Sequence, residues 1–232
     1  MAGLSSSHLL KLALPLIKTH GFTREALARS VISLPSTSTA QPYTEPLSDS
    51  AVTALFGKGD AARRTLIDAW LDDGLKYMTV GPASVEALAG VEQEEAPPRT
   101  IRDVLRARLE YNEPVLPHIP DAFAVMATSG FHVVDPLPAM KHALKIADGA
   151  CIATGDKSLQ LEWYAHRASL AAVYTAAELH QLTSPHTAPA FLDSLLESTS
   201  NLKSAVAEVA LYSDYVFKSW KGIIKSSGVL PP

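Results

Sequence analysis

Aromatic and charged side chains recur at helical intervals in the stretch EWYAHRASLAAVYTAAEL, residues 162–179. Trp163 precedes Arg167 by four residues and Tyr174 follows it by seven, so all three would share one face of a helix. Glu178 lies one turn further on, where its carboxylate could pair with a cation or accept a hydrogen bond from a ring hydroxyl. Two interpretations are open: an ordinary core helix closed by an Arg–Glu clamp, or a helix that offers aromatic side chains to a partner.

Catalytic and metal-binding motifs are scarce in the rest of the sequence. Glu162 and His166 lie four residues apart, but a helical di-iron site needs Glu-x-x-His pairs on facing helices, and no second pair is present. We interpret them as a hydrogen-bonded surface pair. The sequence also lacks a phosphate-binding G-x-x-x-x-G-K-[ST] loop, a G-x-S-x-G elbow and an H-E-x-x-H helix. We therefore expect a protein that is not an enzyme and has no metal or cofactor.

Composition limits the class of protein. With 232 residues, of which 47% are hydrophobic, the chain can bury one sizeable core, and we expect one domain. Its 20 basic and 24 acidic residues give a formal net charge of −4, which offers no bulk attraction to nucleic acid or anionic lipid. The single Cys151 excludes an internal disulfide and is expected to be a buried apolar residue in a reducing compartment. No apolar run reaches the roughly 20 residues that span a bilayer, and no targeting segment is evident.

Apolar residues recur with helical periodicity along almost the whole chain, which predicts an all-α fold of about ten helices. Gly21 should end the first helix, Thr23 should cap the second, and the third should start at Ser48. The expected helices lie at residues 6–20, from 23 onward, and at 48–56, 60–78, 81–90, 99–112, 116–130, 136–154, 162–179, 189–199 and 202–226.

The segments LPLIKTHGFTREALA and AVTALFGKGDAARRTLIDAWL, at residues 14–28 and 51–71, resemble the amino-terminal half of a TetR-type regulator. A DNA-reading helix-turn-helix needs a short turn and a recognition helix with basic side chains. Here a Ser/Thr/Pro loop at 35–46 replaces the turn, and the would-be recognition helix at 48–56 has no Lys or Arg. Basic residues able to grip a DNA backbone follow only at Lys58, Arg63 and Arg64. We therefore expect no nucleic-acid binding, and a TetR-type transcriptional regulator that binds DNA and a small apolar effector is the competing function.

The last expected helix is strongly amphipathic. Its apolar face would carry Val209, Tyr212, Tyr215, Val216, Phe217, Trp220, Ile223 and Ile224. The opposite side carries the lysines Lys218, Lys221 and Lys225. Aromatic residues on an apolar face, with lysines able to reach outward, favour a helix that lies in a membrane interface. The alternative is a terminal helix docked on its own core.

The opening stretch and the segment SPHTAPAFLDSLL, residues 184–196, together resemble one specific family. Its pattern is Trp-Tyr-x-x-Arg-x-x-Leu-x-x-Val-Tyr-x-x-Thr-Glu-Leu, followed by Ser-Pro and Phe-Leu. The matching positions are Trp163, Tyr164, Arg167, Leu170, Val173, Tyr174, Glu178, Leu179, Ser184, Pro185, Phe191 and Leu192. The family is that of the mitochondrial coenzyme Q (ubiquinone) biosynthesis lipid-binding protein, the ninth of the numbered Coq proteins. Ala177 replaces the family's Thr and the connection after the helix is short, which indicates a divergent, fungal-like member.

This resemblance implies a TetR-like fold that has lost DNA binding, a cavity for isoprenoid quinone lipids, and a terminal helix that engages the membrane surface. It implies peripheral attachment to the matrix side of the mitochondrial inner membrane. The protein would be a non-catalytic accessory of ubiquinone biosynthesis. It would present isoprenoid quinone intermediates to the di-iron demethoxyubiquinone hydroxylase, and would work with other proteins of that pathway. The partner-binding residues would be Trp163, Tyr164 and Arg167.

Within one continuous domain we expect three parts. Residues 1–80 form a degenerate helix-turn-helix part, 81–200 a helical ligand-binding core, and 201–232 the amphipathic membrane-interacting helix. We assign the lipid-binding surface to apolar positions at Leu105, Leu109, Phe123, Met126, Leu144, Leu170 and Tyr174. Whether the chain forms a homodimer is open at this stage.

Overall fold

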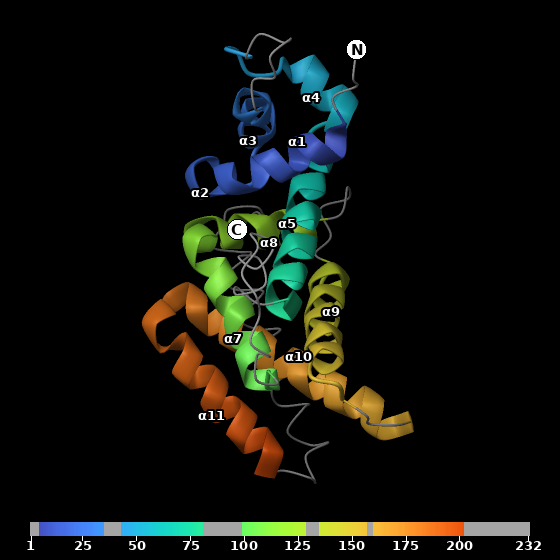
Figure 1. Cartoon of the computed structure of the whole chain (residues 1–232), viewed down its shortest axis with the longest axis vertical. Coiled ribbons are helices and arrows are strands. Elements are labelled where there is room, and N and C mark those ends of the chain that lie inside the picture. The colour runs from blue at the N-terminus through green and yellow to red at the C-terminus, as the bar shows by residue number, and fades with distance from the viewer. Residues whose placement is uncertain (1–4, 35–42, 81–98, 129–134, 157–159, 202–232) are drawn as a thin grey trace, which may run out of the picture.

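The computed structural model describes residues 5–34, 43–80, 99–128, 135–156 and 160–201, the side chains of 160–162 and 200–201 excepted. In these residues the regular secondary structure is helical and none is β-strand, which confirms the predicted all-α class (Figure 1). The α-helices are α1 (Ser6–Ala13), α2 (Ile17–His20), α3 (Arg24–Arg29), α4 (Asp49–Phe56), α5 (Asp60–Val80), α7 (Ile101–Asn112), α8 (Ile119–Ala127), α9 (Leu137–Ala153), α10 (Gln160–Thr183) and α11 (Ala188–Asn201). Short 3₁₀ segments are η1 (Leu14–Leu16), η2 (Ser30–Ser33), η3 (Glu113–His118) and η4 (Pro185–Thr187).

The first expected helix is interrupted. Residues 6–20 form α1, η1 and α2 in succession, because Pro15 lacks an N–H and its ring crowds the preceding helical turn. Gly21 then ends α2 with a positive φ of 65°, as expected. A side chain would be strained there, and its Cβ would also come within 2.9 Å of the His118 imidazole.

The predicted cap of α3 is present in the structure, and α4 has a side-chain cap of the same kind. The Thr23 hydroxyl accepts a hydrogen bond from the Ala26 N–H at 3.4 Å, and the Ser48 hydroxyl accepts one from the Ala51 N–H at 3.3 Å. Each satisfies a backbone donor that the helix itself leaves unpaired, a contribution of about 1 kcal/mol. α7 begins with a reciprocal capping box between Thr100 and Asp103.

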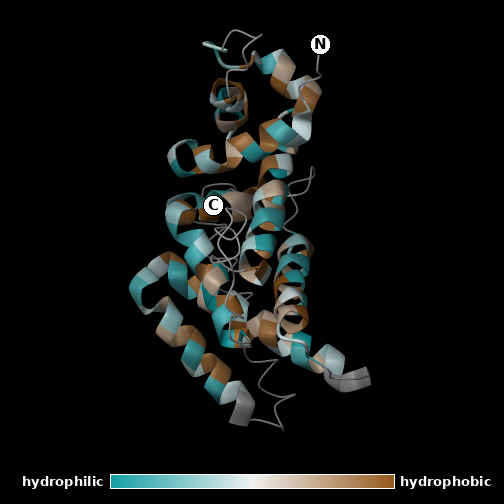
Figure 2. Ribbon diagram, viewed as in Figure 1, coloured by the Kyte–Doolittle hydropathy of each residue, from teal (hydrophilic) through white to brown (hydrophobic). Residues whose placement is uncertain are grey.

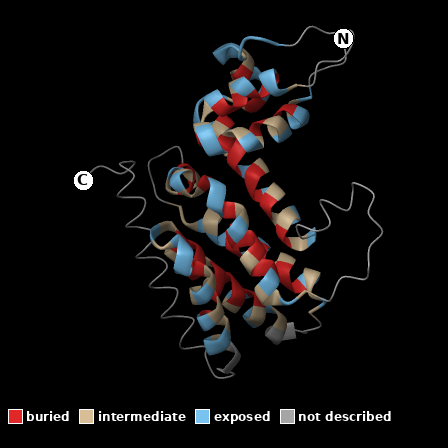
Figure 3. Ribbon diagram, turned by 60° about the vertical axis from the view of Figure 1, so that its left-hand side comes forward, coloured by how far each residue is buried: buried red, intermediate tan, exposed pale blue. Residues whose placement is uncertain are grey.

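The long helix α5 connects two apolar clusters. Its first half, including Leu66 and Trp70, packs with α1, α3, α4 and α8, and its second half contributes Met78 to a cluster formed with α7, α9, α10 and α11. Buried residues accordingly run along the whole length of α5 in Figure 3. Apolar and hydrophilic residues are interspersed along each helix in Figure 2, as expected for helices with one buried face.

The site lies at the end of the molecule formed by α7, α9, α10 and α11. α10 runs across this end and packs against both α9 and α11 (Figure 1). It is longer than the expected helix at 162–179, because residues on both sides continue the same helical pattern. η4 reverses the chain direction, and α11 places Leu192 and Leu195 in the cluster beside α10.

Some predictions fall outside the described residues. These are the expected helix at 81–90, most of the Ser/Thr/Pro loop, and the expected helix at 202–226 with all of its proposed membrane-contact residues. Among the helices that are described, none combines the length and the apolar character needed to span a bilayer.

Candidate functional site

The amino-terminal end of α10 carries an aromatic pair at the surface, Trp163 and Tyr164, which we call the aromatic patch. Tyr164 is 69% exposed and Trp163 is partly buried beside it. Their ring centroids are 4.7 Å apart with an interplanar angle of 77°, an edge-to-face arrangement. The exposure of Tyr164 is what a partner-binding residue requires.

Arg167 fastens the aromatic patch to neighbouring elements. Its guanidinium carbon lies 4.0 Å from the centroid of the Trp163 ring, and Nε donates to Asp148 Oδ1 of α9 at 2.7 Å. Nη1 donates to Asp156 Oδ2, in the turn after α9, at 3.2 Å. The Arg167 side chain is only 8% exposed, so it contacts the Trp163 ring from the protein interior. The Arg–Glu clamp considered above is therefore an Arg–Asp clamp, and Glu178 instead accepts hydrogen bonds from Tyr174 and Asn112.

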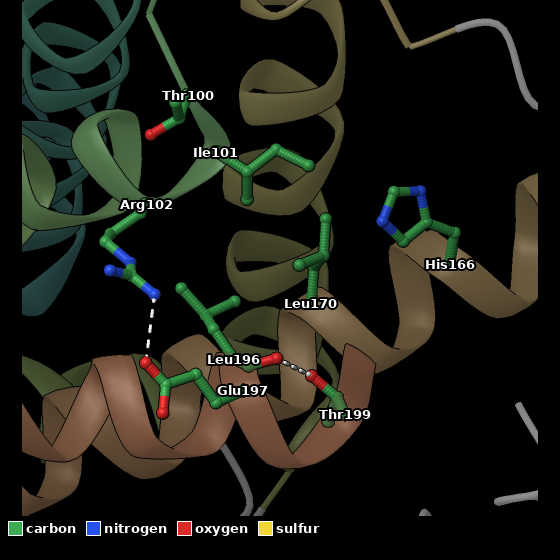
Figure 4. A pocket seen from close by; sticks show the side chains of 8 residues that line it. All are labelled: Thr100, Ile101, Arg102, His166, Leu170, Leu196, Glu197 and Thr199. Carbon is green, nitrogen blue, oxygen red and sulfur yellow. Dashed lines mark hydrogen bonds and ion pairs between the residues drawn. The ribbon is translucent and has the colours of Figure 1, made fainter. Parts of the chain in front are cut away.

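A pocket of about 390 Å³ lies between the start of α7, α10 and the end of α11 (Figure 4). Ile101, Leu170 and Leu196 point toward one another at its centre. Arg102 and Glu197 form an ion pair of 3.4 Å at one side. Thr100, His166 and Thr199 complete the described lining. The apolar centre with a polar rim can hold an elongated apolar group.

The predicted lipid-binding residues do not all lie together. Leu105, Leu109, Leu170 and Tyr174 belong to the cluster around α10, whereas Phe123 and Met126 pack in the cluster near the amino terminus. Leu144 is 44% exposed on α9. Among the described residues that line the pocket, Leu170 is the only one from the predicted set. Ile101 and Leu196 were missed, because the packing of α7 on α11 has no local signal in the sequence.

Tyr174 and Glu178 take part in a buried polar network. The fully buried Tyr174 hydroxyl donates to Glu178 Oε1 at 2.8 Å, which is the ring-hydroxyl contact expected for Glu178. Asn112 Nδ2 of α7 donates to the same carboxylate oxygen at 3.0 Å, and approaches the Tyr174 hydroxyl at 3.3 Å. Burial raises the pKa of Glu178 and raises the pKa of Tyr174 well above its usual value.

Arg108 of α7 extends this network toward α5 and α9. It is fully buried, donates from Nη1 to Asn112 Oδ1, and places Nη2 3.5 Å from His142 Nε2. Its guanidinium carbon lies 4.8 Å from the centroid of the Trp70 ring, and Gly74 leaves room for it. Burial, followed by the charge of Arg108, lowers the pKa of His142 well below 6.5, so this imidazole is neutral at physiological pH. The network links buried side chains of α5, α7, α9 and α10 and so fixes the packing of these four helices.

Basic residues of the amino-terminal part are engaged within the fold. Arg63 donates to the Phe22 carbonyl at 2.9 Å and to Asp121 Oδ2 at 2.5 Å. Arg64 donates to the Thr128 carbonyl. Of the three basic residues considered for DNA-backbone contact, Arg63 and Arg64 therefore bond to the turn before α3 and to α8 and its end, while Lys58 is exposed. This arrangement argues against the competing DNA-binding function.

The described residues thus define an all-α protein with an aromatic patch held by an Arg–Asp clamp and an apolar pocket that shares α10 with it. This combination is typical of proteins that bind partners and apolar ligands. The family model described as COQ9 matches residues 137–203, a segment that contains the patch, its Arg–Asp clamp and α11.

Curated relatives agree with this match. The chain is 28% identical over 171 residues to the ubiquinone biosynthesis protein COQ9, mitochondrial, of Bos taurus, an alignment covering 74% of this chain and 48% of the relative. It is 25% identical over 178 residues to the probable ubiquinone biosynthesis protein coq9, mitochondrial, of Dictyostelium discoideum, covering 75% and 52%. The Homo sapiens COQ9 protein is 25% identical over 180 residues, covering 74% and 48%. The chain is thus similar to COQ9 proteins over about three quarters of its own length, and it spans about half the length of the curated relatives it matches.

Proposed function

We propose that this protein is a non-catalytic accessory protein of ubiquinone biosynthesis that binds isoprenoid quinone intermediates and presents them to an enzyme at the mitochondrial inner membrane. The names of the relatives support the pathway and the organelle. The sequence resemblance supplies the finer proposal that the receiving enzyme is the di-iron demethoxyubiquinone hydroxylase.

The observation that carries this proposal is the aromatic patch. Large aromatic side chains are the commonest energetic anchors of protein interfaces, and Tyr164 is 69% exposed. Arg167 stacks on Trp163 and is itself held by Asp148 and Asp156, so the patch is organised before any partner arrives. A preorganised contact surface loses little side-chain entropy on binding, which favours affinity.

The pocket between α7, α10 and α11 supports lipid binding. Its volume of about 390 Å³ is within the range of small-molecule sites and can accommodate part of an isoprenoid chain. Leu170, in the pocket, follows Trp163 by seven residues, or about 10 Å along the α10 axis. A lipid held there would lie close to an enzyme docked on the aromatic patch.

Docking is tested by measuring binding of the full chain to the immobilised hydroxylase by surface plasmon resonance. Replacing both Trp163 and Tyr164 by Ala should weaken binding at least about 30-fold, because each anchor contributes more than about 1 kcal/mol. The matched control is Tyr43→Ala, which removes another exposed aromatic ring, 48% accessible, from the amino-terminal part. Equal affinities of the double variant and the unsubstituted protein would exclude docking through the patch.

Membrane attachment is proposed from the sequence of the terminal segment. Trp220→Glu places a charge on its expected apolar face, and should abolish flotation of the full chain with anionic vesicles. Tyr43→Glu adds the same charge elsewhere and should leave flotation unchanged. Flotation that persists in the Trp220 variant would contradict this part of the proposal.

A further inference from the structure

The turn after α9 brings together three side chains of types that bind transition metals, and the functions described above use none of them as ligands. Cys151 comes from α9, Asp156 from the turn and His166 from α10. Their candidate ligand atoms, one sulfur, one oxygen and one nitrogen, all lie within 4.8 Å of one another. We propose that Cys151, Asp156 and His166 form a binding site for a zinc-like divalent cation, with a fourth position open to water.

The geometry is close to that of a bound ion. Ligands at zinc-bond distances around a tetrahedral centre are separated by about 3.3–3.8 Å. His166 Nδ1 and Asp156 Oδ2 are 3.5 Å apart, which is already within this range. Closing the cluster around an ion therefore needs side-chain movements on the order of 1 Å. The mixture of thiolate, imidazole and carboxylate favours Zn²⁺ over Mg²⁺ or Ca²⁺, which prefer oxygen ligands alone.

The local charge also suits a divalent cation. With the Cys151 thiol deprotonated by the metal, three anionic groups, including Asp148 and Asp156, face the single positive charge of Arg167. Two negative charges are then left for the ion to neutralise. Arg167 also bonds to Asp148 at 2.7 Å, so the guanidinium stays attached to α9 when Asp156 binds the metal.

The three ligands range from partly exposed to fully buried, so the site is open to an ion on one side and closed to bulk water on the other. The His166 side chain is 35% exposed and borders the pocket between α7, α10 and α11, so an ion can enter from that side. Asp156 is 15% exposed and Cys151 is fully buried, which protects the sulfur from bulk water. Burial raises the pKa of the Cys151 thiol, and binding must therefore release its proton.

A bound ion would tie the end of α9 and the following turn to α10, close to Arg167. The expected consequence is a more rigid aromatic patch in the metal-bound protein. This inference does not depend on lipid binding, because Zn²⁺ binding is measured on the full chain without lipid or partner.

The test is zinc binding by the full chain after treatment with a chelator, measured by equilibrium dialysis with elemental analysis. One equivalent of Zn²⁺ per chain is expected, and Co²⁺ should give a thiolate-to-cobalt charge-transfer band. Cys151→Ala and His166→Gln should each weaken Zn²⁺ binding at least about tenfold. His8→Gln, which removes an exposed histidine outside the cluster, should bind as the unsubstituted protein does.

Circular dichroism of each variant separates loss of ligand from loss of fold. His166→Gln is the decisive variant if Cys151→Ala fails to fold, since His166 lies at the surface. Failure of the full chain to bind Zn²⁺, or equal affinity in His166→Gln and His8→Gln, would overturn the proposal. A cobalt spectrum without the thiolate band would also overturn it.

Discussion

Replacing Tyr174 by Phe removes one hydroxyl from the buried network and preserves the shape of the ring. That hydroxyl donates to Glu178 at 2.8 Å and lies 3.3 Å from Asn112 Nδ2. A hydrogen bond to a carboxylate contributes about 1.5–3 kcal/mol and a neutral one about 1 kcal/mol. Asn112 and Glu178 keep their mutual bond of 3.0 Å, which limits the loss. We expect the free energy of unfolding to fall by about 2 kcal/mol, equivalent to a decrease in Tm of about 4–8 °C for a chain of this size.

Urea unfolding followed by far-ultraviolet circular dichroism measures this difference. Tyr164→Phe is the matched control, because it makes the same change on the same helix at a ring that is 69% exposed. Its effect should stay within about 0.5 kcal/mol. If Tyr174→Phe were as stable as Tyr164→Phe, the Tyr174 hydroxyl would face solvent or lipid instead of the network, and our description of this part of the core would be refuted.

Three further predictions concern stability. Burial raises the pKa of Glu178 above 4.5, so the contribution of this carboxyl group to stability is greatest below that pH and declines as pH rises through the folded-state pKa. Glu178→Gln should remove this decline in urea titrations at several pH values. An unchanged pH profile in the variant would contradict this prediction. Gly74→Ala places a Cβ 2.9 Å from the buried guanidinium carbon of Arg108 and should lower the free energy of unfolding by about 1–3 kcal/mol. In Gly149→Ala the new Cβ meets side chains only at 3.5 Å, so the same urea titration should show a neutral or slightly stabilising effect. Leu105→Ala should cost about 2–5 kcal/mol and Leu144→Ala less than about 0.5 kcal/mol, because the first is fully buried and the second 44% exposed; equal values would show that the two sites have similar environments.

Local sequence signals predicted local structure. Helical periodicity and the cap residue Thr23 act over a few positions of the chain. The structure has the predicted all-α class and the predicted cap, and α4 begins directly after Ser48. The sequence predicted one continuous helix at residues 6–20, and the break at Pro15 was missed. The apolar pattern continues across Pro15, so periodicity alone does not show where the helix is interrupted.

Contacts between helices could not be predicted in the same way. The Arg167 clamp was expected from a glutamate on its own helix, but its partners are Asp148 and Asp156, which the packing of α9 against α10 brings close. The same packing places Cys151 beside His166, so the expectation of no metal site, which rested on spacing along one helix, did not consider this cluster.

The buried network illustrates the same limit. Arg108, His142 and Glu178 come from α7, α9 and α10, and no spacing within any of these helices indicates their proximity. Sequence reasoning assigned Tyr174 to a lipid-binding surface from its apolar ring. The structure adds the polar partners of its hydroxyl, which is the group that decides its energetics.

Lipid binding is the central claim, and the most direct measurement is mass spectrometry of lipids extracted from the purified full chain after incubation with vesicles that contain an isoprenoid quinone. We predict close to one quinone per chain, and a clear decrease in Leu196→Trp, which places a larger side chain at the centre of the pocket. The exposed-site control Leu137→Trp, at a position 55% exposed, should retain the lipid. A full chain that carries no quinone, or a Leu196→Trp variant that carries as much as the control, would contradict the proposed role of the pocket.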